Sequence, residues 1–146
     1  MNRAEYLRSV GLEADETCVV AGIAARLNPV KDIATLIRGF AKAHRAFPAL
    51  RLLIAGDGEE MANLKQLAAD LGVAKAVCFA GWISDTDSFY NALDINTLTS
   101  ISETFPYALT EGARAGLPTI SSKVGGVSYL IDHGSNGFLF PPGEDQ

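Results

Sequence analysis

The sequence is poor in the features that mark metal sites, nucleic-acid binding and membrane insertion. Only two cysteines and two histidines are present, and Lys and Arg number 12 against 17 Asp and Glu. The resulting net charge of −5 repels a long polyanion from most of the surface. No segment has the uninterrupted apolar run of a signal peptide or membrane helix. We therefore expect a soluble, cytoplasmic domain with no metal and no nucleic-acid partner.

The few cysteines and histidines are interpreted as structural or surface residues. Cys18 and Cys78 each lie in an apolar run, where a free cysteine commonly acts as a small buried hydrophobe. His44 and His133 have no Cys or carboxylate at the spacing of metal ligands, so both are expected on the surface.

The 146 residues, 48% of them hydrophobic, fit one domain of ordinary size. Short apolar runs bounded by turn residues alternate with amphipathic stretches, which is typical of successive βα units. We predict an α/β fold with a Rossmann-like parallel sheet of about six strands and flanking helices. The strands are expected at Cys18–Ala25, Arg51–Ala55, Val77–Ala80, Ile95–Thr99, Pro118–Ser121 and Gly137–Phe140.

Two long helices are predicted between the first three strands. Asp32–Ala46 and Glu59–Leu71 both carry apolar residues at helical spacing, and Gly72 is a C-terminal stop for the second. The apolar stripes are Ile33, Leu36, Ile37 and Phe40 in the first helix, and Met61, Leu64, Leu67, Ala68 and Leu71 in the second. The last residues, PPGEDQ, are acidic where a further helix would begin, so we expect a piece of a longer protein.

Ligands of an open parallel sheet bind at the carboxyl ends of its strands, so the loops that follow the strands are the candidate sites. The loop after the first strand reads ARLNPVK and places Arg26 and Lys31 on either side of a Pro-containing turn before a helix. Two cations beside a helix N-terminus can bind a diphosphate. Taken alone, an Arg and a Lys near a turn are more often solvated surface charges.

The segment after the fourth strand, SISETFPYALTEGARAGLPTI, contains two carboxylates seven residues apart. Pro106 suits the first turn of a helix, which would leave Glu103 in the preceding loop and Glu111 on the second turn. Both carboxylates could face one ligand. Spacing alone favours a helix-start acid at Glu103 and a solvent-facing residue at Glu111 over that arrangement.

Nearly the whole chain resembles the retaining glycosyltransferases of the GT-B fold, in the group called group 1 or family 4. The resemblance rests on six segments in the order of that fold's carboxy-terminal domain: RLNPVK, LRLLIAGDGEE, FAGWIS, SETFPYALTEGARAGLPTI, KVGGV and NGFLFPPGE. It implies that residues 1–146 are a single nucleotide-sugar-binding domain, one half of a two-domain enzyme.

The resemblance also assigns roles to individual residues. The family's diphosphate-binding Arg and Lys fall on Arg26 and Lys31, its sugar-binding Glu on Glu103 and its ribose-binding Glu on Glu111. Three further positions complete the implied site: the main chain near Ile83 for the base, and the amides of Thr104 and Phe105 for the sugar and phosphates. Two positions depart from the family pattern, because Pro106 stands where many relatives have Gly and Tyr129 where Glu is frequent.

The implied function is transfer of a sugar from a nucleoside diphosphate donor with retention of configuration. No cofactor or metal is implied, because Arg26 and Lys31 can neutralise the leaving diphosphate. The acceptor and any membrane association would belong to a missing amino-terminal domain, so the chain by itself should not transfer sugar. A nucleotide-sugar epimerase of the same fold and a non-catalytic nucleotide-sugar-binding module remain alternatives, although the presence of all four charged residues disfavours a decayed module.

Two motifs compete with this interpretation. GDGEEM resembles a dinucleotide fingerprint, but Met61 occupies its third glycine position and no acid ends the next strand, so a tight turn at Gly56–Gly58 is favoured. Asp85 and Asp87 form an Asp-x-Asp pair that could hold a metal. Ser84 and Asp87 instead match a helix-capping pattern, which we favour.

Overall fold

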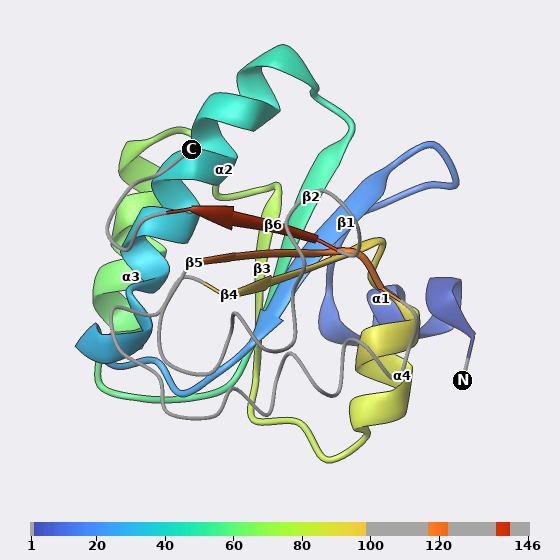
Figure 1. The fold of residues 1–146 in the computed structure, drawn as a ribbon. Coiled ribbons are helices and arrows are strands. Elements are labelled where there is room, and N and C mark those ends of the chain that lie inside the picture. The colour runs from blue at the N-terminus through green and yellow to red at the C-terminus, as the bar shows by residue number, and fades with distance from the viewer. Residues whose placement is uncertain (1, 99–116, 123–136, 141–146) are drawn as a thin grey trace.

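A single parallel sheet organises the molecule (Figure 1). The computed structural model describes residues 2–98, 117–122 and 137–140. Six strands pair in the order β3-β2-β1-β4-β5-β6. Their bounds are β1 Val19–Ala24, β2 Leu50–Ala55, β3 Val77–Gly81, β4 Ile95–Leu98, β5 Thr119–Ser122 and β6 Gly137–Phe140. The predicted Rossmann-like α/β class and all six predicted strands are therefore confirmed.

The strand order reverses at β1. The chain runs from β1 outward through β2 to β3, then returns to place β4 on the other side of β1, where Ala21 pairs with Ile95. At such a reversal the loops after the two central strands diverge and leave a crevice at the carboxyl ends of the strands. The crevice between β1 and β4 is therefore where the topology alone places a ligand.

Helices cover both faces of the sheet (Figure 1). One face carries α2 and α3, and the other carries α1 and α4. Their bounds are α1 Arg3–Val10, α2 Ile33–Ala46, α3 Met61–Asp70 and α4 Thr86–Asn91, with a short 3₁₀ turn, η1, at Pro29–Lys31. Among the residues that the structure describes, no helix has the length and apolar character needed to cross a bilayer.

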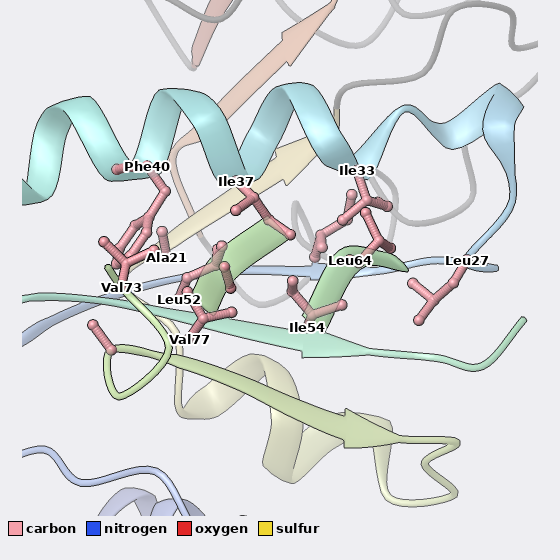
Figure 2. Close-up of a cluster of buried hydrophobic side chains, with 14 residues drawn as sticks. Ala21, Leu27, Ile33, Ile37, Phe40, Leu52, Ile54, Leu64, Val73 and Val77 are labelled. Carbon is pink, nitrogen blue, oxygen red and sulfur yellow. The ribbon is translucent and has the colours of Figure 1, made fainter. Parts of the chain in front are cut away.

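The core beneath α2 and α3 follows the alternation of the strands (Figure 2). Ala21 and Ile23 of β1 and Leu52 and Ile54 of β2 point to this face, while the residues between them point to the other. The predicted apolar stripes supply the helical side of the core: Ile33, Ile37, Phe40, Leu64 and Ala68 are buried, and Leu36, Met61, Leu67 and Leu71 are partly buried.

The second core joins α1 and α4 to the opposite face of the sheet. Tyr6 and Leu7 from α1 pack with Phe89 and Tyr90 from α4, and the rings of Phe89 and Tyr90 meet edge to face at 5.0 Å. The loop that follows β3 leads directly into α4. Because α4 is packed in this core, the end of that loop is held in place relative to β1 and β2.

The isolated cysteines and His44 have structural environments. Both cysteines are free, with Cys18 buried and Cys78 partly buried, its thiol donating to the carbonyl of Val10 at 3.1 Å. His44 is partly buried where a surface histidine was predicted, because its ring stacks on Phe40 and its Nδ1 lies 3.1 Å from the carbonyl of Leu50. His133 lies outside the described residues.

An ion pair fastens the start of the chain to the middle of the sheet. Arg3 donates to the Asp94 carboxylate at 2.8 Å and to the carbonyl of Cys18 at 3.0 Å. The other carboxylate oxygen of Asp94 accepts from the Val20 amide at 2.8 Å. Burial raises the pKa of Asp94, whereas the hydrogen bonds from Arg3 and Val20 and the charge of Arg3 lower it. The lowering effects together are larger, so the net shift is downward.

We expect Asp94→Asn to destabilise the domain in a pH-dependent way. A carboxylate whose folded pKa is depressed adds stability above its unfolded pKa, about 4, and loses that contribution as the pH falls through the folded value. At pH 7 the variant should be less stable by about 1 kcal/mol, a modest figure because both partners are partly exposed. Urea unfolding of both proteins at several pH values measures the difference, which should shrink below about pH 4.

Asp70→Asn is the matched control, since that exposed carboxylate only accepts from the Gln66 side chain on its own helix. An Asp94→Asn effect that stayed constant with pH, or that Asp70→Asn reproduced, would contradict the assigned role.

Candidate functional site

A cavity of about 280 Å³ lies at the carboxyl ends of the first three strands. Its walls come from the end of β1 and the loop after it, the end of β2 and the turn after it, and the loop between β3 and α4. The lining residues are Ala24, Ala25, Arg26, Ala55, Gly56, Asp57, Trp82 and Ile83. Two residues predicted from separate segments, Arg26 and Ile83, therefore line one cavity.

Two larger hollows lie elsewhere on the described surface. One, of about 530 Å³, is lined by Glu13, His44 and Arg51, and the other, of about 620 Å³, by Lys65, Cys78 and Phe79 among others. The first lies where β2 begins and the second along β3, the edge strand of the sheet. We favour the smaller cavity, because ligands of open parallel sheets bind beyond the carboxyl ends of the strands.

Two of the loops that line this cavity, those after β1 and β2, pack closely against each other. Gly56 has φ 130, and a Cβ at that position would lie 1.8 Å from the carbonyl oxygen of Ala25. A Cβ at Gly58 would lie 2.5 Å from the carbonyl oxygen of Leu27. The Leu27 amide donates to the Asp57 carbonyl at 3.0 Å, and the Glu60 amide donates to the Leu27 carbonyl at the same distance. The glycines thus form a tight turn that lets the β2 loop pack against the β1 loop, as predicted.

The β1 loop holds the two predicted cations in a turn organised by Asn28. The Asn28 amide donates to the Arg26 carbonyl at 3.0 Å, and its side chain accepts from the Lys31 amide at 3.2 Å. The Arg26 side chain is exposed and lines the cavity, whereas Lys31 is partly buried and follows on the same loop, beyond the lining residues. One loop therefore carries both cations, and only Arg26 reaches the cavity.

The junction after Lys31 differs from the prediction that the helix begins at Asp32. Lys31 ends the 3₁₀ turn η1, and Asp32 takes a left-handed conformation, φ 48, before α2 begins at Ile33. In the described part of the chain, Asp32 is the one non-glycine residue with positive φ. The hydroxyl of buried Thr35 donates to the Asp32 carboxylate at 2.7 Å, and Arg38 donates to that hydroxyl at 3.0 Å. These bonds hold an unfavourable backbone conformation next to a predicted diphosphate ligand.

Trp82 is a site residue that the sequence prediction missed. Its side chain is 77% exposed, although it lines the cavity beside Ile83. Large aromatic side chains are usually well buried, so a strongly exposed tryptophan at a cavity is a feature of interest. The segment FAGWIS contains the signal, the only tryptophan of the chain, but the sequence does not show that its side chain is exposed.

One member of the Asp-x-Asp pair, Asp85, caps helix α4, so capping is confirmed but the predicted cap at Ser84 is wrong. The N-cap of α4 is Asp85, not Ser84, because the helix begins at Thr86. The Asp85 carboxylate accepts from the Ser88 hydroxyl at 2.5 Å and from the Ser88 amide at 3.0 Å, and these bonds lower the pKa of Asp85. Within residues 2–98, 117–122 and 137–140, no three or more His, Cys, Asp and Glu residues gather where they could hold a metal ion.

The remaining predicted site residues lie outside the described residues. They are Glu103, Thr104, Phe105, Pro106 and Glu111, and Tyr129, a departure from the family pattern, lies outside them too. The first five follow β4, which ends at Leu98 and pairs with β1. The chain therefore leaves β4 on the side of β1 opposite to β2, at the reversal of strand order.

Comparison with known proteins gives a family match over almost the whole chain. The model of the family "Glycosyl transferases group 1" matches residues 8–146. The chain is 36% identical over 114 residues to the lipopolysaccharide core biosynthesis glycosyltransferase LpsE of Rhizobium meliloti, a match covering 78% of this chain. The chain spans about a third of the length of most of these curated relatives, 32% in the case of LpsE.

Solved structures share the fold. The crystal structure of Anabaena HepE in complex with UDP-glucose is 31% identical, with a TM-score of 0.87 over 99% of this chain and 40% of HepE. The C-terminal domain of LpcC, a glycosyl transferase group 1 family protein of Francisella tularensis, is 24% identical, with a TM-score of 0.85 over 99% of this chain and 77% of that domain. The likeness to LpcC shows the fold.

Proposed function

The chain belongs to the family of glycosyl transferases group 1, and we propose that it holds a nucleoside diphosphate sugar as the donor for glycosyl transfer. The observation that carries this proposal is the cavity in which Arg26 and Ile83 meet, at the carboxyl ends of the strands and beside the reversal of strand order. The complex of the similar HepE with UDP-glucose supports the donor class.

Different parts of the donor are bound by the cavity and by the loop after β1. The base lies in the cavity near the main chain of Ile83, and the diphosphate lies toward Arg26 and Lys31. A volume of about 280 Å³ is at the small end for a ligand site, which suits one part of the donor. The ribose belongs to Glu111, and the transferred sugar and phosphates to Glu103 and the amides of Thr104 and Phe105.

The chemistry we assign to these residues is stabilisation of the leaving group. When the bond between the anomeric carbon and the diphosphate oxygen breaks, its electron pair stays on the diphosphate, and Arg26 and Lys31 stabilise the added charge. Preorganised cations can contribute several kcal/mol to such a step, about 3 kcal/mol for a single oxyanion donor. The reaction proceeds with retention of configuration and needs neither a metal nor a cofactor.

We infer that residues 1–146 are a single domain, the carboxy-terminal half of a two-domain GT-B enzyme of the family 4 type. Their span of about a third of the relatives' length, and their coverage of most of the isolated LpcC domain, support this assignment. The acceptor then binds largely to the other domain. Relatives that carry glycosyltransferase names favour sugar transfer over the epimerase alternative.

Nucleotide titrations test the proposal. We expect the 146-residue chain to bind UDP, and Arg26→Ala and Lys31→Ala each to weaken UDP binding by about tenfold, the equivalent of one charge-assisted contact. Binding of uridine should change much less, because uridine lacks the charge that the cations recognise. Calorimetry with both ligands measures the two constants, and Arg45→Ala, an exposed cation in the last turn of α2, is the matched control.

Chelation adds an independent arm to the titrations. EDTA should leave UDP binding unchanged. Equal losses for uridine and UDP would mean that the cations support the fold and not the ligand. Loss of binding with EDTA that Mn²⁺ restored through Asp85 and Asp87 would overturn the metal-independent assignment.

A further inference from the structure

One exposed aromatic side chain stands at the proposed donor site without a role in the assignments above. Trp82 follows β3 directly and lines the same cavity as Arg26. The same cavity is lined by the small residues Ala24, Ala25, Ala55 and Gly56. Their short side chains leave room in the cavity, about 280 Å³, for a flat group beside the indole.

The loop that carries Trp82 is fixed at both ends. On one side, the carbonyl of Gly81 accepts from the Gly56 amide at 2.7 Å, which ties the end of β3 to the glycine turn. On the other side, Ile83 packs on the second core, and Asp85 caps α4. The indole is therefore exposed on a backbone held in place, and burying it against a ligand would cost little ordering of the loop.

We propose that Trp82 is the stacking platform for the base of the nucleotide, so that a side chain holds the base in addition to the main chain near Ile83. This inference rests on the proposed function, because it names a further binding residue of the same site. Stacking of a base on an aromatic side chain strengthens binding by about tenfold or more and accepts any base, since every base has a π-face. Trp82 thus contributes affinity for the base, while base selectivity comes from hydrogen bonds.

The single tryptophan of the chain makes stacking directly observable. Titration of the 146-residue chain with uridine or UDP should change the Trp82 fluorescence until the signal saturates. The dissociation constant fitted to this signal should equal the one measured by calorimetry. Pyrophosphate, which has no base, should compete with UDP and leave the emission nearly unchanged. Emission that did not respond to bound uridine or UDP would overturn the stacking.

Variants separate stacking from the rest of the site. We expect Trp82→Ala to weaken binding of UDP and uridine by the same factor, about tenfold, and to leave pyrophosphate binding unchanged. Trp82→Phe should retain most of the affinity, because phenylalanine still offers a π-face. Phe47→Ala is the matched control, since Phe47 is also exposed, at 45%, and lies at the end of α2 outside the cavity.

The two proposals fail in different ways. Trp82→Ala that bound UDP as tightly as the wild-type chain, while Arg26→Ala lost affinity, would overturn the stacking platform and leave the donor site standing. A wild-type chain that bound neither uridine nor UDP would overturn both. A Trp82→Ala loss confined to UDP, with uridine binding unchanged, would place the indole at the diphosphate and also contradict the proposal.

Discussion

Gly56→Ala is expected to destabilise the domain by about 3 kcal/mol or more and to abolish nucleotide binding. Two costs add at this position. The backbone has φ 130, a region that residues with a Cβ rarely adopt, and the new methyl group would lie 1.8 Å from the carbonyl oxygen of Ala25. Because that atom belongs to the backbone, relief requires the end of β1 to move away from the end of β2. Urea unfolding and UDP calorimetry measure the two effects.

Gly72→Ala separates the two costs. Gly72 also has a positive φ, 75, but its Cβ would meet nothing within 4 Å, so only the backbone penalty of about 1 kcal/mol is expected there. UDP binding should persist in Gly72→Ala, because this glycine follows α3 and lies outside the cavity. A loss of stability in Gly56→Ala no larger than in Gly72→Ala would contradict the close contact.

The shape of the cavity depends on the glycine turn at Gly56–Gly58 more than on its charged residues. Gly56 and Gly58 allow the β2 loop to approach the carbonyls of Ala25 and Leu27. Arg26 lies between those two carbonyls on the same loop and is positioned by their contacts. A substitution that disrupts this turn is therefore expected both to displace Arg26 and to change the shape of the cavity.

Sequence reasoning predicted the sheet well because the strands are buried on both faces. Val20, Leu53 and Ile54 belong to continuous apolar runs bounded by turn residues, and such runs indicate a central parallel strand without any tertiary information. Helix α2 was equally visible from its apolar stripe. Only the bounds of the strands changed, by no more than one residue at any strand end.

Helices without a strong apolar stripe were harder to predict. Helix α1 was not predicted, since Tyr6 and Leu7 are adjacent and only two apolar residues of the helix are buried. The sequence does contain a signal for its start, because Asn is a favoured N-cap residue. In the structure the Asn2 side chain accepts from the Glu5 amide at 2.8 Å. The cap of α4 was placed one residue early, at Ser84, because Ser84 and Asp85 are both good N-cap residues.

The site was partly predictable because its residues come from loops at one end of the sheet. Arg26 and Ile83 could be assigned from their segments, and the parallel topology brings those segments together. The exposure of Trp82 and the left-handed conformation of Asp32 depend on tertiary contacts, so neither was apparent from residue types. The roles of Arg26 and Ile83 stay predictions, and so do those of Glu103 and Glu111, which lie outside the described residues.

The 146-residue chain on its own is expected to bind UDP. It should not catalyse the formation of UDP from UDP-glucose above the uncatalysed background. Transfer requires the acceptor oxygen within about 3–3.5 Å of the anomeric carbon, a geometry that can contribute about 7–11 kcal/mol to the barrier reduction. The residues that we propose to bind the donor are Arg26 and Lys31 for the diphosphate, and Trp82 and Ile83 for the base. If the acceptor site belongs to a second domain, as proposed, a diphosphate bound to residues 1–146 alone also stays open to water, which weakens its ionic contacts by raising the effective dielectric constant.

A UDP-release assay with UDP-glucose and a panel of sugar and lipid acceptors measures transfer. Calorimetry on the same preparation is the control, because retained UDP binding shows that the donor site is folded and that the lack of transfer does not come from unfolding. Lack of turnover together with retained binding would agree with a donor-binding half-enzyme. Acceptor-dependent UDP release that Arg26→Ala abolished would mean that these 146 residues contain a complete catalytic site, and the assignment of the acceptor to a second domain would then be wrong.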